Sequence, residues 1–199
     1  MIVIGLTGGI GTGKSTVAGF LRELGAHVVD LDRAGHEVIK SGTDVYNRLL
    51  KTFGTSIIGV DDEIDRSRLG QIVFSDARAL DRLNAIVHPA IDEIVARTQE
   101  ECRRLDVPVL VLEAAAMLEN QRRWQADEIW ITVAPEKTVL DRLACRSGYS
   151  EQQARARIRS QMTDAERRKL ADVVIDTDCT LDELRNRVAI EWQHLLQRK

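Results

Sequence analysis

The fold of this chain is indicated first by residues 8–15, which read Gly8-Gly9-Ile10-Gly11-Thr12-Gly13-Lys14-Ser15 and match the pattern G-x-x-x-x-G-K-[ST] at every fixed position. Glycine is needed in such a loop because the backbone must wrap closely around a phosphate and turn its N–H groups inward. The lysine can reach the β- and γ-phosphates, the serine hydroxyl can bind Mg²⁺, and the dipole of the following helix attracts the same anion. The stretch therefore predicts a P-loop that binds a nucleoside triphosphate.

The residues around this loop supply the candidate ligands of ATP and Mg²⁺. Glu113 closes an apolar run, and in P-loop proteins an acid in this place usually touches Mg²⁺ through water; capping of the next helix is the alternative. Ser15 is the second candidate metal ligand, and Lys14 is also a candidate catalytic residue. The residues that we assign to ATP binding are Gly9, Gly11, Thr12, Gly13, Lys14, Ser15 and Thr16.

Apolar runs on either side of the loop predict the fold class. Runs at 2–7, 27–31, 107–112, 128–133 and, more briefly, 172–175 are rich in Val, Ile and Leu, as is typical of parallel strands covered on both faces. Helical spacing of apolar residues follows at 14–24, ending at Gly25, and again at 181–196. This alternation predicts an α/β fold with a five-stranded parallel sheet flanked by helices.

Two stretches interrupt the alternation and divide the chain. Residues 33–104 contain helical patterns without a convincing strand and are too long for one crossover, so they predict an inserted helical subdomain. Residues 140–170 carry eight Arg or Lys against four Asp or Glu, a local charge of +4, whereas the remainder carries −7 to give the net −3. The predicted nucleotide-binding core therefore comprises 1–32, 105–139 and 171–199.

Composition limits the function classes. A chain of 199 residues with 44% hydrophobic and 30% charged residues is typical of one soluble globular core. An aromatic content of 4% argues against recognition of single-stranded nucleic acid by stacking. The three cysteines and four histidines show no disulfide or zinc spacing, and no apolar stretch approaches the length of a membrane span. We therefore expect a cytoplasmic protein in a reducing compartment.

Two acids near the end of the second apolar run are candidates for the chemistry of an acceptor hydroxyl. Asp30 and Asp32 are spaced by two, so on a strand they share one face at the carboxyl end, where α/β sheets place ligands. A carboxylate there could orient a substrate hydroxyl and accept its proton. The alternative is that Asp32 caps a helix starting near Arg33. The D-x-x-G pattern at 32–35 also occurs in GTPases, but no Asn-Lys-x-Asp follows it.

Two arginines in the basic segment are candidates for the stabilisation of transferred charge. Arg142 and Arg146 are four residues apart and hence on one helical face. Beside a P-loop they could neutralise charge that develops on the phosphoryl group. A solvated helix face is the alternative, and binding of nucleic acid is another use of such a segment, although no groove-reading motif is present.

These residues together resemble the dephospho-CoA kinase family of P-loop small-molecule kinases. The P-loop is widely shared, but the block that contains Arg66, Phe74 and His88-Pro89 is quite specific. The resemblance covers nearly the whole chain and rests on residues 5–15, 29–32, 64–74, 83–89, 142–146, 156–162 and 171–176. It implies a P-loop kinase fold in which 33–104 is a helical substrate (CoA) domain and 140–170 a mobile lid.

The resemblance also implies a reaction and roles for residues. The reaction is MgATP-dependent phosphorylation of the ribose 3′-hydroxyl of dephospho-CoA. Asp32 would be the catalytic base and a substrate contact, Arg142 and Arg146 the lid arginines, and Arg66 and His88 further substrate contacts; His88-Pro89 could equally be a pair that bends a helix. ATP and dephospho-CoA are the expected partners, with no nucleic acid, membrane or obligate protein partner.

The sequence departs from the family pattern in two places, and two other functions remain as alternatives. Many bacterial members have Asp-x-Pro-Leu-Leu-Phe-Glu where residues 113–119 read Glu-Ala-Ala-Ala-Met-Leu-Glu, which resembles the kinase half of animal bifunctional CoA synthases. Thr177 stands where the family has an Asn that follows the fifth strand. The alternatives are a nucleoside or nucleoside-monophosphate kinase and a P-loop binding module with slow hydrolysis.

Overall fold

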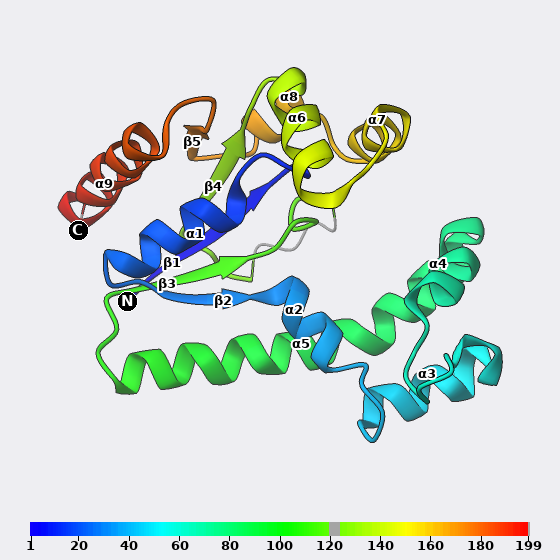
Figure 1. Cartoon of the computed structure of the whole chain (residues 1–199). Coiled ribbons are helices and arrows are strands. Elements are labelled where there is room, and N and C mark those ends of the chain that lie inside the picture. The colour runs from blue at the N-terminus through cyan, green and yellow to red at the C-terminus, as the bar shows by residue number, and fades with distance from the viewer. Residues whose placement is uncertain (120–123, 199) are drawn as a thin grey trace. The chain divides into compact units, whose positions relative to one another are not determined.

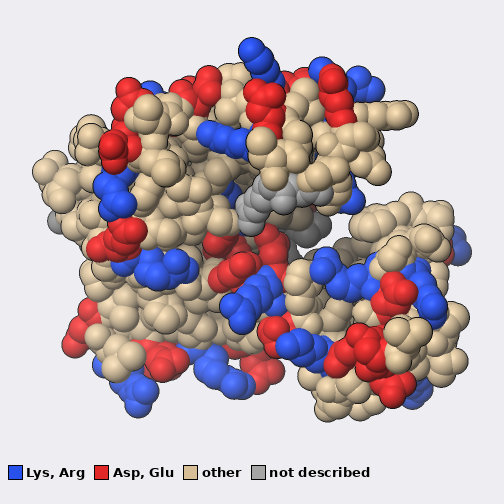
Figure 2. Space-filling model, in the orientation of Figure 1, with Lys and Arg blue, Asp and Glu red and all other residues tan. Residues whose placement is uncertain are grey.

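The structure is a computed structural model that describes residues 1–119 and 124–198; the side chains of residues 146 and 147 are also outside the described part. The chain divides into two units, one formed by Met1–Asp30 with Cys102–Lys199 and the other by Leu31–Glu101. On the face drawn in Figure 2, basic and acidic side chains are interspersed, which agrees with the small net charge of −3. No helix of the described residues has the length and apolar character that crossing a bilayer requires.

A parallel sheet organises the first unit (Figure 1). Within the described residues it has five strands in the order β2-β3-β1-β4-β5, each paired in parallel with its neighbours. Their bounds are Ile2–Gly8 (β1), His27–Asp30 (β2), Val109–Glu113 (β3), Glu128–Val133 (β4) and Val173–Asp176 (β5). Every residue of β1 and β3 is buried, as their continuous apolar sequence predicts. The predicted five-stranded parallel sheet is confirmed.

Helices α1 (Lys14–Glu23) and α9 (Leu181–Gln197) pack side by side against the sheet. Each buries one apolar stripe at helical spacing, which for α1 includes Val17 and Leu21. The sequence also sets their ends. Gly25 adopts φ 100 just beyond α1, and Thr180 begins α9 with a capping box in which Glu183 is the partner.

Residues 136–168 form three further helices of the first unit: α6 (Glu136–Ser147), α7 (Glu151–Arg159) and α8 (Asp164–Arg168). A small apolar cluster that includes Leu143 of α6 and Ala154 of α7 joins α6 to α7. α8 begins at a capping box, in which the hydrogen bond from the Thr163 hydroxyl lowers the pKa of Glu166. The function of 140–170 as a lid stays a prediction.

The second unit is helical, as predicted for most of residues 33–104. It comprises α2 (Leu31–Glu37), α3 (Asp44–Phe53), a 3-10 turn η1 (Thr55–Ile57), α4 (Arg66–Ser75) and most of α5 (Ala77–Arg104). Its own apolar core includes Leu49, Ile57 and Val73. α5 continues through Pro89, which lies inside the helix. Binding of the acceptor substrate by this unit stays a prediction.

The structure corrects one detail of the sequence interpretation. We expected Asp30 and Asp32 to share a strand face, but β2 ends at Asp30 and α2 begins at Leu31, so Asp32 lies in the first turn of a helix. The reason is the limited pairing of this edge strand. Among the described residues β2 pairs only with β3, and Asp30 is in register with Glu113, the last residue of β3. β2 therefore has no residue of β3 to pair with beyond Asp30, and the negative charge of Asp32 in the first turn of α2 interacts favourably with the helix dipole.

Candidate active site

The P-loop joins β1 to α1 in a path that only glycine allows at two positions. A Cβ on Gly8 would lie 2.2 Å from Thr132 Oγ1 and 2.8 Å from the Thr132 carbonyl oxygen on β4, so the backbone there is in close contact with the next strand. Gly13, the residue before α1, adopts a left-handed conformation with φ 85. The loop therefore turns tightly, and the N-terminus of α1 faces the loop.

Thr12 is the member of the loop whose side chain turns away from the ligand face. Its Oγ1 donates to the carbonyl oxygen of Gly9 at 2.8 Å and lies 2.7 Å from Thr132 Oγ1, and the residue is only 3% exposed. These contacts fasten the loop to β4. Binding of ATP by Thr12, as predicted, would therefore use its backbone and not its hydroxyl.

Lys14, Ser15 and Glu113 converge where β3 ends beside the start of α1. Both Lys14 Nζ and Ser15 Oγ lie 3.0 Å from the same carboxylate oxygen, Oε1 of Glu113, and donate to it. Glu113 is only 4% exposed, so the ion pair is largely shielded from water. The structure thus brings these three predicted site residues into contact, and their roles in binding ATP and Mg²⁺ stay predictions.

The donor atoms in this cluster suit Mg²⁺. A carboxylate oxygen and a hydroxyl oxygen are hard ligands, which Mg²⁺ prefers. The described part of the chain holds no group of three or more His, Cys, Asp or Glu that could bind a metal. Such a sparse set fits Mg²⁺, because this ion usually binds through one or two protein groups together with phosphates and water.

Arg142 of α6 connects the P-loop to the segment after β5. Its Nη1 donates to Thr177 Oγ1 at 2.9 Å and to the carbonyl oxygen of Gly11 at 3.3 Å, and its Nη2 donates to the Thr177 carbonyl oxygen at 2.6 Å. Thr177 Oγ1 in turn lies 2.8 Å from the Thr12 carbonyl oxygen. Thr177, which departs from the family pattern, is therefore buried, with 1% exposure, and its hydrogen bonds connect the end of β5 to the P-loop.

A pocket of about 730 Å³ lies over the P-loop. It extends from Lys14 and Ser15 to Leu181 and Leu184 at the start of α9. Its remaining walls come from segments far apart in the sequence, namely Gly8, Gly9, Ile10, Gly11, Gly13, Thr16, Ala115, Arg142, Leu143, Cys145, Tyr149, Gln161, Thr177, Cys179, Leu181 and Leu184.

Comparison with known sequences decides the family. A family model described as dephospho-CoA kinase matches residues 2–183. The chain belongs to the dephospho-CoA kinase family. Relatives named dephospho-CoA kinase from Thermobifida fusca and Dehalococcoides mccartyi are 40% and 37% identical to it over 199 and 190 residues; the matches cover 100% and 96% of this chain and 98% and 96% of theirs. As a member of this family, the chain is an ATP-dependent phosphotransferase.

Solved structures agree with the fold expected of a dephospho-CoA kinase family member. The crystal structure of TT1252 from Thermus thermophilus is 32% identical with a TM-score of 0.83, over 98% of this chain and 97% of that one. A dephospho-CoA kinase from Campylobacter jejuni, 23% identical, has a TM-score of 0.60 and 96% coverage of both chains. A shikimate kinase from Acinetobacter baumannii, 16% identical, has a TM-score of 0.57 over 100% of this chain and 95% of that one. The P-loop kinase fold is confirmed.

The other predicted site residues of this dephospho-CoA kinase family member lie outside the P-loop cluster. Asp32, Arg66 and His88 belong to the helical unit, in the first turn of α2, at the start of α4 and inside α5. Asp30 ends β2 in register with Glu113. The side chain of Arg146 is outside the described residues.

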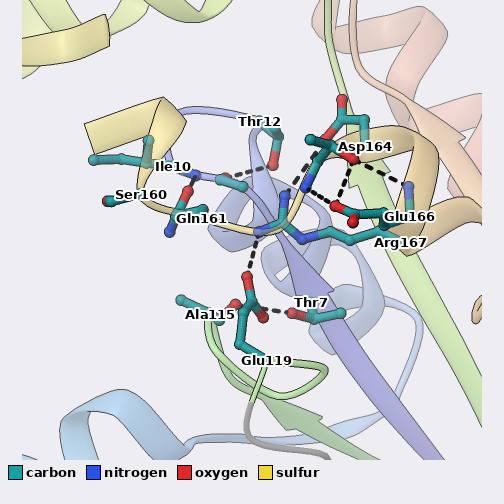
Figure 3. Close-up of polar contacts among 12 residues, drawn as sticks. Thr7, Ile10, Thr12, Ala115, Glu119, Ser160, Gln161, Asp164, Glu166 and Arg167 are labelled. Atoms are coloured by element: carbon teal, nitrogen blue, oxygen red, sulfur yellow. Dashed lines mark hydrogen bonds and ion pairs between the residues drawn. The ribbon is translucent and has the colours of Figure 1, made fainter. Parts of the chain in front are cut away.

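Three residues beside the P-loop were not predicted: Gln161, Arg167 and Glu119 (Figure 3). Gln161 Oε1 accepts a hydrogen bond of 2.8 Å from the backbone N–H of Ile10. Arg167, only 2% exposed, donates from Nη2 to Glu119 Oε1 at 2.5 Å. Gln161 lies in a stretch that carries the family resemblance, and this was its only signal in the sequence; Arg167 stands in a basic run that suggested a solvated surface.

Proposed function

We propose that this chain transfers the γ-phosphate of ATP to the ribose 3′-hydroxyl of dephospho-CoA, giving coenzyme A and ADP in the cytoplasm. The observation that carries the proposal is the convergence of Lys14, Ser15 and Glu113 at the P-loop, on one wall of a pocket of about 730 Å³. The family membership supplies the identity of the acceptor.

The P-loop cluster accounts for the handling of the phosphates. Backbone N–H groups of the loop and of the first turn of α1 bind phosphate oxygens, and Lys14 exchanges Glu113 for a phosphate. Ser15 and Glu113, the latter through water, would hold Mg²⁺, which would neutralise charge on the phosphate chain. Phosphoryl transfer proceeds through a loose transition state, so that fixed charge and positioning supply most of the catalysis.

The acceptor side rests on residues that the family resemblance assigns. We propose that Asp32 orients the ribose 3′-hydroxyl and accepts its proton, while Arg66 and His88 bind the acceptor. Arg142 and Arg146 would neutralise charge on the phosphoryl group from the 140–170 lid. The bonds of Arg142 to Thr177 and Gly11 support a further task, which is to hold the P-loop in its binding shape.

The experiment that tests the proposal is a comparison of acceptors. Purified protein with MgATP is given dephospho-CoA, adenosine, AMP or shikimate in parallel, and ADP formation is followed together with the mass of the acceptor. We expect ADP and a monophosphorylated product with dephospho-CoA alone, and loss of turnover in excess chelator. Preferred phosphorylation of adenosine or AMP would favour a nucleoside or nucleoside-monophosphate kinase. ATP binding without turnover on any acceptor would favour a binding module.

A further inference from the structure

The connection between α7 and α8 brings an uncharged side chain, Gln161, onto the P-loop. The backbone N–H of Ile10 donates to Gln161 Oε1 at 2.8 Å. A backbone N–H can only donate, so this bond sets the orientation of the carboxamide, with its oxygen toward Ile10 and its nitrogen on the opposite side. Figure 3 shows this arrangement.

The nitrogen of this carboxamide forms no hydrogen bond within the described part of the chain. Gln161 Nε2 carries two N–H groups, and in the described part of the chain neither meets a protein acceptor. Gln161 also lines the 730 Å³ pocket over the P-loop together with Lys14 and Ser15. A pair of amide donors on the wall of a phosphate-binding pocket matches the acceptor oxygens of a phosphate.

The order of the strands indicates which phosphate these donors meet. Thr177 and Cys179, beyond β5, line one end of the pocket, whereas Lys14 and Ser15 meet Glu113 at the end of β3. β3 and β5 lie on opposite sides of β1 in the sheet. A nucleotide whose phosphates reach the Lys14 cluster therefore has its terminal phosphate on the β3 side and its base on the β5 side.

Arg167 ties the α7–α8 connection to the segment that follows β3. It binds Glu119, six residues beyond the end of β3, at 2.5 Å, and Asp164 at 3.5 Å. A Cβ on Gly9 would lie 3.0 Å from its Nη1, so the guanidinium lies against the loop. Arg167 Nε and Glu119 Oε2 are buried without a hydrogen-bond partner among the described residues, so this pair is only partly satisfied. The connection is thus fastened beside Ile10.

We propose that Gln161 binds the γ-phosphate of ATP through its Nε2 while its Oε1 keeps the P-loop in shape through the Ile10 N–H. This inference rests on the proposed function, because it takes the P-loop pocket as the ATP site. It makes Gln161 a substrate-contacting catalytic residue in addition to Lys14 and the arginines. A neutral donor at this point distinguishes ATP from ADP without adding charge to the site.

The competing explanation is that Gln161 only anchors the P-loop, and Gln161→Glu separates the two. The introduced carboxylate has the same shape and still accepts the Ile10 hydrogen bond, but it has no donor and repels phosphate. Gln161→Met removes both the acceptor and the donors. Gln152→Glu is the matched control, since it adds the same charge at an exposed position of α7.

The readout is the dissociation constant for ATP and for ADP, measured by titration calorimetry without acceptor, together with kcat. For Gln161→Met we expect the preference for ATP over ADP to fall about tenfold, the value of one hydrogen bond to a charged group. For Gln161→Glu we expect this preference to fall further, and for Gln152→Glu we expect it to equal that of the wild type. kcat with dephospho-CoA should fall in both Gln161 variants.

Two results would overturn the proposal. One is a wild-type ratio of ATP to ADP affinity in Gln161→Glu; the other is an equal loss of ATP and ADP affinity in Gln161→Met. Thermal unfolding reports whether each variant folds, and the side-chain amide signals of ¹⁵N-labelled wild type provide a second test, since one pair should shift with a non-hydrolysable ATP analogue and not with ADP. The binding ratio needs no acceptor, so a failure of the proposed acceptor chemistry would be seen separately in the wild-type assay.

Discussion

Thr177→Val tests whether a buried hydroxyl holds the P-loop ready for ATP. Valine has almost the same shape as threonine, so the 1% exposed site stays filled while the hydroxyl is lost. The lost contacts are the bond of the hydroxyl proton to the Thr12 carbonyl oxygen at 2.8 Å, shared with the Val133 carbonyl oxygen at 3.2 Å, and the bond from Arg142 Nη1 at 2.9 Å. Arg142 keeps its bonds from Nη2 to the backbone carbonyl of residue 177 and from Nη1 to the carbonyl oxygen of Gly11.

The expected loss follows from the one hydrogen bond that the hydroxyl donates and the one that it accepts. A buried neutral hydrogen bond contributes about 1 kcal/mol and one to a charged group about 1.5 kcal/mol or more, so the free energy of unfolding should fall by roughly 2–3 kcal/mol. For a chain of this size, Tm should then fall by about 4–12 °C. Because Thr12 and Gly11 are less restrained without ligand, we also expect ATP to bind about three- to tenfold more weakly.

The measurements are Tm by calorimetry and the dissociation constant for ATP by titration. Thr43→Val is the matched control, because Thr43 Oγ1 accepts from the Tyr46 N–H at 3.0 Å and caps α3 in the helical unit. It should cost about 1 kcal/mol of stability, as lost caps do, and leave ATP affinity unchanged. A Thr177→Val protein with unchanged ATP affinity would refute the reasoning, whatever its Tm.

Three further substitutions test the chemistry of the site. Lys14→Ala should abolish turnover without unfolding the protein, which kcat and circular dichroism will show; near-normal turnover in a folded variant would contradict the assignment. Glu113→Gln keeps the shape but removes the charge that faces Lys14 and Ser15, so titration of kcat against Mg²⁺ should require at least about tenfold more metal. Asp32→Asn should lower kcat by about a hundredfold with little change in ATP affinity. If Asp32→Asn instead keeps the wild-type kcat and Asp30→Asn loses it, Asp30 is the base.

The central strands of the sheet could be predicted from the sequence because they are buried on both faces. Val109–Glu113 is buried at every residue, and its Val- and Leu-rich sequence has the pattern of a parallel strand covered on both faces. The end of β2 shows where this signal fails. The apolar run continues into Leu31, which is only 3% exposed, but Leu31 is buried as the first residue of a helix. Burial in a short run does not distinguish strand from helix, and so Asp32 was placed on the wrong element.

The P-loop residues could be predicted because their chemistry is local, whereas the rest of the site depends on distant partners. Gln161 meets Ile10 across 151 residues and Arg167 meets Glu119 across 48, and no periodicity reports such pairings. Arg167 illustrates the difficulty further. It opens a basic run of three residues, yet it is 2% exposed while the next two are exposed. A charged residue is seldom buried unless it is paired, and the sequence does not reveal the pair.

The Lys14–Glu113 pair links the binding of phosphate to the binding of a cation. When a phosphate draws Lys14 away, the Glu113 carboxylate keeps its hydrogen bond from the Ser15 hydroxyl but loses the ion pair with the Lys14 ammonium group. Glu113 is only 4% exposed, so water compensates little for this loss. An uncompensated buried charge is costly, so ATP alone should bind less tightly than the same ATP with Mg²⁺. Glu113→Gln removes the charge and should therefore narrow the difference between ATP and MgATP affinity. We therefore expect this protein of net charge −3 to bind a polyanion by an exchange of partners within one small cluster.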